Sequence, residues 1–457
     1  MHKQNTFPKN FIWGVATSSY QIEGAPTAGG KGPSVWDIFS HSPGKIKNND
    51  NGDIACNHYE LWPQDITIMK ELGINAYRFS ISWPRIFPTG IESKPNQSGL
   101  DFYSKLVDVL LENNITPFVT LNHWDIPQGL EEIGGWPNRE IVNEFVKYSY
   151  HTSNHLGDRV KYWITHNEPW CVSYLGYVIG RKPPGLSQNW PKSLAAAHHL
   201  MLSHGMAIPE IRSNSDSSEV GITLNLNTAV PASDSKYDED ACRFYDGQFN
   251  RLYLNPLYKS EYPDDVFEFL RSRDWISQSD LNFIKDDDLN IISTKTDFLG
   301  VNYYSRGVIR NEEIDEKNNH TRNVEIGEKT DFGWEIYPPG IYDLLIRLKN
   351  EYSVNNIYIT ENGCSYGDGP NSEGKIRDTK RIKYFDSHLK ELKRSIQDGV
   401  QCNGYFAWSL MDNFEWAEGF SQRFGLVWVD FETQERIPKD SYYWYQKFIS
   451  SNGIEVK

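Results

Sequence analysis

The chain has 457 residues, of which 61 are acidic and 46 are basic, so its formal net charge is −15. An acidic chain without a basic block lacks the electrostatic footprint that phosphate backbones require, which excludes nucleic-acid binding and docking on anionic membranes. A mean hydropathy of −0.60, with no apolar run near the roughly 20 residues of a spanning helix, excludes a membrane protein. A hydrophobic content of 39% excludes a disordered chain.

The cysteines and the N-terminus bear on where the protein works. The five cysteines are scattered and no two share C-x-x-C spacing, so neither a zinc site nor a disulfide framework is indicated. Free buried thiols are typical of the reducing cytosol. Residues 1–8 (MHKQNTFP) contain no apolar stretch that fits a signal peptide. We therefore expect a cytoplasmic location.

No Pro/Ser-rich linker, charge block or low-complexity tract divides the chain. The polar loops at 44–53, 213–219 and 311–330 are too short or too embedded to separate domains. A single α/β barrel with insertions can exceed about 400 residues. We therefore expect one domain over residues 1–457.

Short runs rich in β-branched and aromatic residues recur along the chain. In chain order they are 11–19, 76–83, 116–124, 161–168, 220–227, 298–304, 357–361 and 404–411. Near-continuous apolar runs are typical of parallel strands buried on both faces, and eight βα units predict a (β/α)₈ TIM barrel with extended βα loops. An open doubly wound sheet is the alternative, but the phosphate loop G-x-G-x-x-G is absent after the first run.

Helical periodicity fills the intervals between these runs. From Phe102 onward, apolar residues follow at i, i+4, i+7 and i+8, and we expect Asp101 to cap that helix. Residues 382–396 keep an apolar 3-4-3-4 stripe beneath a charged face, and the segment from Ile141 to Tyr148 repeats the pattern. These segments predict amphipathic helices that cover the barrel.

Polar and aromatic residues close the strand runs. They stand at 18–21 (SSYQ), 122–124 (NHW), 167–168 (NE), 302–304 (NYY) and 361–362 (EN). In a β/α barrel, the carboxyl ends of the strands and the loops that follow them build the active site. The pattern predicts one site that suits a polar ligand without charge.

Two glutamates carry the chemistry in this interpretation. Glu168 and Glu361 each follow an apolar run and precede a breaker, on the fourth and seventh runs. Two carboxyls that flank a glycosidic bond are the minimum equipment for glycoside hydrolysis, one as a protonated acid and the other as an ionised nucleophile or base. Arg78 lies inside the second run, and a guanidinium lowers the pKa of a neighbouring carboxylate. We expect it to pair with Glu361, the nucleophile, which leaves Glu168 as the acid.

The alternative is that each glutamate only caps a helix or pairs with a structural arginine. Aromatic residues favour the catalytic interpretation, because sugars offer C–H faces that stack on indole rings and hydroxyls that need donors and acceptors. The side chains that provide this mixture are Trp334, Trp408, Trp416, Glu415, Gln21, His123 and Asn302. Most of the 15 Trp are expected in the core, and a histidine at a strand end can equally be structural.

Metal and cofactor chemistry finds no support in the sequence. The twelve histidines include the adjacent pair His198 and His199, but no H-E-x-x-H arrangement is present. We expect neither a metal nor a cofactor.

Several blocks of the sequence carry a family resemblance. They are 11–24 (FIWGVATSSYQIEG), 77–85 (YRFSISWPR), 122–125 (NHWD), 167–169 (NEP), 302–304 (NYY), 360–363 (TENG) and 408–416 (WSLMDNFEW). Together, in this order, they resemble the signatures of glycoside hydrolase family 1, the retaining β-glucosidases and their relatives. The resemblance extends from about residue 7 to residue 448.

The resemblance implies a (β/α)₈ barrel with Glu168 as acid/base and Glu361 as nucleophile, and it places Arg78, Asn302 and Tyr304 around the nucleophile. The residues that it implies for binding the glycone are Gln21, His123, Asn167, Glu415, Trp416 and, as a stacking floor, Trp408. We also expect Trp124, Trp334 and Phe424 in the substrate site.

Two segments depart from the family pattern. Position 166 is more often apolar, and a protonated His166 would lower the pKa of Glu168. Residues 180–185 (GRKPPG) differ from the usual G-x-H-A-P-G, which we expect to affect only the packing of that loop. The acid at position 168 is present, unlike in the plant thioglucosidase branch, where glutamine replaces it.

We therefore predict a retaining β-glucosidase that hydrolyses terminal non-reducing β-D-glucosyl residues of oligosaccharides or of aryl and alkyl β-glucosides. Its partner is the small-molecule substrate. A 6-phospho-β-glycosidase is the nearest alternative, and Glu415 argues against it because a carboxylate repels phosphate. A catalytically silent carbohydrate-binding barrel has no reason to keep both glutamates. The choice among gluco, galacto and fuco configurations, the oligomeric state, and the leaving group set by loops 171–190 and 305–340 stay open.

Overall fold

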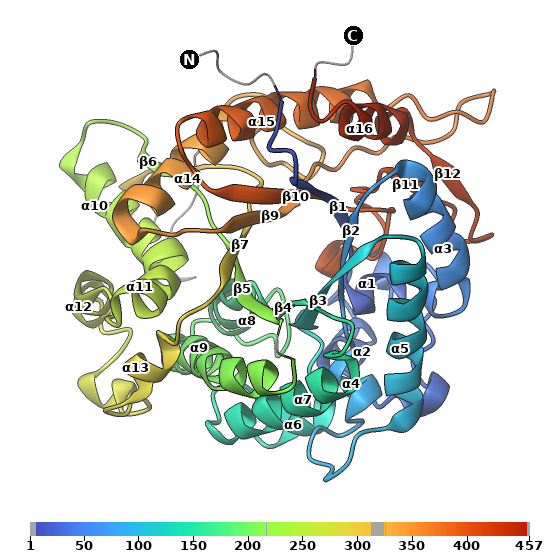
Figure 1. Ribbon diagram of the computed structural model, residues 1–457. Helices are drawn as coiled ribbons and strands as arrows, with labels where there is room; N and C mark the ends of the chain where they lie inside the picture. Colours follow the sequence, from blue (N-terminus) through green and yellow to red (C-terminus); the bar gives the residue numbers. More distant parts are fainter. Residues whose placement is uncertain (1–5, 216, 312–323, 325, 455–457) are drawn as a thin grey trace.

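The computed structural model describes residues 6–215, 217–311, 324 and 326–454, and its centre is a closed barrel of eight parallel strands (Figure 1). The strands are β1 (Ile12–Ala16), β2 (Ala76–Ser80), β3 (Thr116–Asn122), β4 (Tyr162–Asn167), β5 (Glu219–Asn225), β7 (Phe298–Asn302), β9 (Ile357–Asn362) and β10 (Cys402–Trp408). Each strand pairs with its chain neighbours, and β10 closes on β1. Each predicted run begins within two residues of one of these strands, so the predicted fold class is confirmed.

Aromatic side chains fill the barrel. The ring centroids of Phe118 and Phe406 lie 4.9 Å apart, and those of Phe298 and Tyr358 lie 5.2 Å apart. Gly14 makes room for this layer, because a Cβ atom there would come within 2.4 Å of the Phe406 ring. The barrel is therefore a packed core, and the polar residues of the strands are displaced to the carboxyl ends.

Helices surround the barrel (Figure 1). The longer ones are α3 (His58–Leu72), α5 (Gln97–Glu112), α7 (Glu140–Leu156), α9 (Trp190–Ser213), α14 (Pro339–Tyr352), α15 (Thr379–Gln397) and α16 (Asp440–Ser450). Between β5 and β7 the chain forms α10 (Lys236–Asp246), α11 (Leu252–Lys259), α12 (Asp264–Ser272) and α13 (Asp288–Ile292). The three predicted helical stripes lie on α5, α7 and α15, which confirms them. No helix in the described ranges has the length and apolar character needed to cross a lipid bilayer.

The prediction that Asp101 caps its helix is wrong. Helix α5 begins at Gln97, so Asp101 lies inside it, where its carboxylate accepts a hydrogen bond of 2.8 Å from Gln97 Nε2. The apolar stripe of this helix extends back to the buried Leu100 and Gly99. That burial requires the helix to start before Asp101.

Short elements build the loops at the carboxyl ends of the strands. They are α1 (Ser19–Ile22), α2 (Val35–Ser40), α4 (Trp83–Ile86), α6 (Gln128–Glu132), α8 (Pro169–Tyr174), the paired strands β6 (Ala229–Pro231) and β8 (Gly307–Ile309), and the hairpin of β11 (Val427–Val429) and β12 (Arg436–Pro438). Residues 312–323 and 325, which belong to the predicted loops 305–340 and 311–330, lie outside the described residues. So do residues 1–5 of the expected N-terminal segment.

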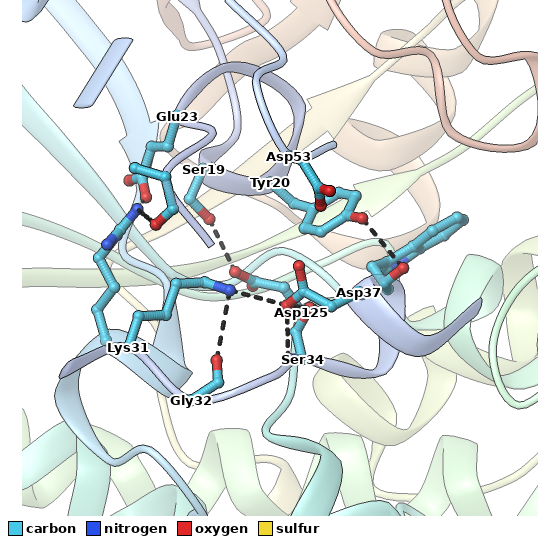
Figure 2. Close-up of polar contacts among 12 residues, drawn as sticks. Ser19, Tyr20, Glu23, Lys31, Gly32, Ser34, Asp37, Asp53 and Asp125 are labelled. Carbon is cyan, nitrogen blue, oxygen red and sulfur yellow. Dashed lines mark hydrogen bonds and ion pairs between the residues drawn. The ribbon is translucent and has the colours of Figure 1, made fainter. Parts of the chain in front are cut away.

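A buried polar network joins the loop after β1 to the loop after β3 (Figure 2). Ser19 Oγ donates a hydrogen bond of 2.9 Å to Asp125 Oδ2, and burial raises the pKa of Asp125 to about 7. Ser19 is followed closely by Gln21, and Asp125 follows Trp124. The network therefore fixes the relative positions of two residues of the predicted substrate site.

A buried charge cluster holds the loop after β10. Asp412 Oδ1 accepts a hydrogen bond of 2.8 Å from Lys439 Nζ, and Asp412 Oδ2 accepts one of 2.8 Å from Arg423 Nη1. Asp412 and Lys439 are fully buried. Asp412 lies between Trp408 and Glu415 in the chain, so the cluster fixes the course of the segment that carries both.

We expect Lys439→Met to lower the free energy of unfolding by about 1.5–3 kcal/mol, because it removes one of the two cations that bind the buried Asp412. Guanidinium unfolding followed by tryptophan fluorescence measures this. The matched control is Lys390→Met, which removes an exposed ion pair with Asp386 and is expected to change stability by less than about 1 kcal/mol. Equal stability of the two variants would contradict the proposed role of the cluster.

Candidate active site

A cavity of about 370 Å³ opens at the carboxyl ends of the strands. The predicted site residues that line it are His123, Trp124, Glu168, Asn302, Tyr304, Trp334, Glu361, Trp408, Glu415, Trp416 and Phe424. The other three predicted residues, Gln21, Arg78 and Asn167, are buried and hydrogen-bonded to this lining. The volume is within the range of sites for small-molecule ligands.

The two glutamates are held by different partners. Glu361 ends β9, and its Oε1 accepts a hydrogen bond of 2.7 Å from Arg78 Nη1, while its Oε2 accepts one of 2.6 Å from the Tyr304 hydroxyl. Glu168 follows β4, and its Oε1 accepts a hydrogen bond of 2.7 Å from Asn302 Nδ2, while its Oε2 accepts one of 3.1 Å from the Cys171 thiol. One carboxyl therefore has a bound cation and the other has only neutral donors.

Asn167 links the two carboxyls into one network. Its Oδ1 accepts hydrogen bonds from Arg78 Nη2 at 2.6 Å and from Asn302 Nδ2 at 3.1 Å. Because Arg78 binds Glu361 and Asn302 binds Glu168, the chain of contacts runs from one carboxyl to the other through three side chains. The groups come from β2, β4, β7 and β9, which explains why a closed barrel is needed to assemble them.

The charge state of Glu361 differs from the expectation. Burial raises its pKa to about 7, and although Arg78 lowers it, the negative charge of Glu168 raises it further. The expected lowering by the guanidinium is therefore present but is outweighed by desolvation and by the second carboxyl. In the free site, Glu361 ionises near neutral pH.

His166 does not carry the positive charge considered in the sequence. It is fully buried, its ring stacks on Phe145 with centroids 4.2 Å apart, and its Nε2 lies 2.9 Å from Ser203 Oγ. Burial holds the pKa of His166 well below its usual range. It is therefore neutral, and it adds no positive charge next to Glu168.

A second group of side chains forms one wall of the cavity. The rings of Trp408 and Trp416 each stack near His123, with centroids 5.9 Å away, and His123 Nε2 lies 3.0 Å from Asn167 Nδ2. Burial and the charge of Arg78 keep the pKa of His123 well below its usual range. A neutral imidazole and two indoles offer the mixture of donor, acceptor and apolar surface that a sugar requires.

Glu415 completes this wall. Its carboxylate accepts a hydrogen bond of 3.4 Å from Gln21 Nε2. Burial raises the pKa of Glu415 to about 8, while Lys182 lowers it. Trp334, which also lines the cavity, contacts Tyr304 and Phe424, with ring centroids 5.1 and 6.1 Å apart. The cavity thus has a polar wall, which includes His123 and Glu415, and an aromatic wall, which includes Trp334 and Phe424.

Two residues of the site are not predicted by the sequence. The sequence indicates Cys171 only as a buried thiol, but its Sγ donates to the carboxyl of Glu168, three residues before it. Lys182 belongs to the segment that we expect to affect only loop packing, but its side chain lines the cavity. The only sign of this role in the sequence is that residues 180–185 depart from the family pattern. Within the described part of the chain, no group of three or more His, Cys, Asp or Glu side chains is placed to hold a metal ion.

Comparisons with known proteins agree with this geometry. Residues 3–454 match the family model described as Glycosyl hydrolase family 1. A β-glucosidase A of Acetivibrio thermocellus is 48% identical over 451 residues, and a 1,4-β-D-glucan glucohydrolase of Thermotoga neapolitana is 47% identical over 454 residues; both matches cover 98% of this chain and 99% of the relative.

Among solved structures, the β-glucosidase from Thermotoga maritima in complex with glucoimidazole is similar, with a TM-score of 0.93 and 46% identity. The match covers 98% of this chain and 100% of that one. Fold, carboxyl pair and sequence thus lead to the same assignment, and the chain belongs to glycosyl hydrolase family 1.

Proposed function

We propose that this chain is a β-glucosidase that removes terminal non-reducing β-D-glucosyl residues with retention of the β configuration. The observation that carries the proposal is the unequal support of two carboxyls in one cavity: Arg78 and Tyr304 bind Glu361, whereas Asn302 and Cys171 bind Glu168. An ionised nucleophile needs the first environment and a proton donor suits the second. Family membership supports retention, and the names of the relatives support glucose as the glycone.

The reaction follows as a double displacement. A carboxylate oxygen of Glu361 attacks the anomeric carbon, the bond from that carbon to the leaving oxygen breaks, and the proton of Glu168 goes to that oxygen. In the second step Glu168 takes a proton from water, the resulting hydroxide attacks the anomeric carbon, and the bond to Glu361 breaks. Two inversions restore the β configuration and return both carboxyls to their starting states.

The glycone is proposed to lie against the polar wall, stacked on the ring of Trp408. Glu415, Gln21 and His123 supply acceptors and donors for its hydroxyls, and Asn167 extends this set. Trp408 ends β10 and lines the cavity, so its indole is the ring proposed to stack on the sugar. Glu415 lies inside the cavity and repels a phosphate when it is ionised, which favours a neutral sugar over a phosphorylated one.

A direct test compares 4-nitrophenyl β-D-glucoside with its 6-phosphate. We expect a higher kcat/KM for the neutral substrate. A preference for the phosphorylated substrate would overturn the proposed substrate class and favour the 6-phospho-β-glycosidase alternative. The kcat/KM values of the corresponding 4-nitrophenyl β-galactoside and β-fucoside in the same assay rank the enzyme's preference among the three glycones.

We also propose that the enzyme works in the cytoplasm on a small-molecule glycoside. All five cysteines are free and buried, which supports a reducing compartment. Cell fractionation with an antibody against the chain tests the location, and recovery in the secreted or periplasmic fraction would contradict it.

We expect Arg78→Met to move the acid limb of kcat/KM to higher pH. The ionised form of Glu361 is the active one, and the pKa of about 7 already includes the lowering by Arg78, so losing the guanidinium raises that pKa and shrinks the active fraction below neutrality. If the pKa of Glu361 rises by about 1, the rate on the acid side falls about tenfold. A pH profile from about 4 to about 9, which brackets the ordinary and the raised pKa of a carboxyl, measures the limb.

Arg78→Lys is the matched variant for this prediction. It keeps the charge but loses the planar donors that bind both Glu361 and Asn167. We expect a smaller displacement of the acid limb than in Arg78→Met, together with a loss of kcat. Identical acid limbs in Arg78→Met and the wild type would show that Arg78 does not control the ionisation of the nucleophile.

A further inference from the structure

Lys182 places an ammonium group inside the cavity, and nothing in the reaction described above uses it. Its Nζ lies 3.2 Å from the ring centroid of Trp124 and 5.3 Å from that of Trp416. Among the residues that the structure describes, no hydrogen-bond or ion-pair partner contacts this ammonium. It therefore rests on two indole faces, with its N–H donors unused by the protein.

The surroundings locate this ammonium relative to the substrate. Trp124 and Trp416 contact each other with centroids 4.5 Å apart, next to His123 on the polar wall. Cys171, which binds the carboxyl of Glu168, lines the same part of the cavity as Lys182. Lys182 thus shares its part of the cavity with the wall proposed for the glycone and with Cys171, which binds the carboxyl proposed to protonate the leaving oxygen.

The charges of this region leave Lys182 available to a ligand. Arg181, its neighbour, pairs with Glu418 through its guanidinium, and Arg306 pairs with Glu335. Both of those cations line the cavity, but each already has a carboxylate partner. Within the described part of the chain, Glu168 and Glu415 act on Lys182 through their charges without forming an ion pair with it. A partly desolvated ammonium without a bonded acceptor gains most from an acceptor oxygen that a ligand brings.

We propose that Lys182 is a specificity-determining residue that donates a hydrogen bond to an acceptor oxygen of the leaving group, next to the scissile bond. Two kinds of leaving group offer this chemistry: an aglycone with a carboxylate close to the glycosidic oxygen, and a second sugar with its hydroxyls. The inference rests on the proposed glucosidase function. It explains why a cation stands where the family pattern has a different residue, in a cavity that also holds the carboxyl groups of Glu168, Glu361 and Glu415.

The test compares substrates within each enzyme, so that a loss of activity common to all substrates cancels in the ratio. Phenyl β-D-glucoside has no acceptor on its leaving group beyond the glycosidic oxygen. The acceptor substrates are 2-carboxyphenyl β-D-glucoside, 3-carboxyphenyl β-D-glucoside and cellobiose, whose leaving groups each carry a further acceptor oxygen. For each enzyme, kcat/KM of every acceptor substrate is divided by that of the phenyl glucoside. We expect Lys182→Met to reduce this ratio by at least about tenfold for at least one acceptor substrate, as the loss of a charged hydrogen bond predicts.

Two variants serve as controls. Lys182→Arg keeps a cationic donor and is expected to retain most of the ratio. Lys47→Met removes a lysine that lies near Glu418, with its Nζ 3.9 Å from that carboxylate, but does not line the cavity, and it is expected to leave the ratio unchanged. A reduced ratio for the carboxyphenyl glucosides identifies a carboxylate as the acceptor, and one for cellobiose identifies a sugar hydroxyl.

Unchanged ratios in Lys182→Met would overturn the proposal. So would an equal loss on phenyl glucoside and on the acceptor substrates, because that result would place Lys182 on the glycone or on the catalytic carboxyls. A wild-type enzyme that hydrolyses none of the four glucosides would instead contradict the proposed function itself. The two failures are therefore distinguishable.

Discussion

Glu361→Gln is expected to lower kcat for an aryl β-glucoside by at least about 10⁴-fold, as removal of a covalent nucleophile does in enzymes whose catalytic groups act as a unit. The neutral amide does not supply the carboxylate that must attack the anomeric carbon. It nevertheless keeps the shape of the side chain and can still accept a hydrogen bond from Arg78 or Tyr304. Steady-state assays with 4-nitrophenyl β-D-glucoside measure the loss.

Binding separates loss of chemistry from loss of the site in this variant. We expect phenyl 1-thio-β-D-glucoside, which resists hydrolysis, to bind Glu361→Gln within about tenfold of its wild-type affinity, because the polar wall with Gln21, His123 and Glu415 is unchanged. Isothermal titration calorimetry measures both proteins. Near-normal hydrolysis by Glu361→Gln would remove Glu361 from the role of nucleophile.

Glu168→Ala is expected to show a loss that depends on the leaving group. General acid catalysis contributes about 10²–10⁴-fold, and this contribution matters most when the leaving oxygen is basic. We expect cellobiose and phenyl glucoside to lose that much in kcat/KM, whereas 2,4-dinitrophenyl glucoside, whose leaving group departs without a proton, keeps its rate of glycosylation. The slope of log kcat/KM against leaving-group pKa measures the effect.

A small anion provides the control for this variant. Azide needs no general base, and the alanine leaves space next to the anomeric carbon. We therefore expect azide to accelerate turnover of the dinitrophenyl substrate by Glu168→Ala and to yield β-glucosyl azide. An equal loss on all leaving groups, or an α-configured azide product, would contradict the assignment of Glu168 as acid/base.

The fold could be predicted from the sequence because the barrel strands are buried on both faces. That burial leaves eight apolar runs in chain order, with the polar residues of the site at their carboxyl ends. Topology then brings Glu168, Glu361 and Asn302 together without any knowledge of side-chain directions. The start of helix α5 was predicted less well, because a capping residue such as Asp101 has the same composition as a residue of the first turns, and the burial of Leu100 decides between them.

The electrostatics of the site could not be predicted from residue identity. Whether Arg78 or desolvation controls the pKa of Glu361 depends on how deeply the carboxyl is buried and on the distance to the other carboxyls. His166 is neutral because α7 and α9 enclose it through Phe145 and Ser203, which are distant in sequence. Lys182 has a long flexible side chain, and only the folded loop determines that it enters the cavity.

The covalent intermediate on Glu361 is the central claim, and trapping it is the most direct test. The enzyme is incubated with 2,4-dinitrophenyl 2-deoxy-2-fluoro-β-D-glucoside, whose fluorine slows the second step more than the first, and then digested for peptide mass spectrometry. We predict time-dependent inactivation with one equivalent of dinitrophenolate released and a 2-fluoroglucosyl ester on Glu361. Binding of the reagent without any adduct, or an adduct on a different carboxyl, would contradict the account.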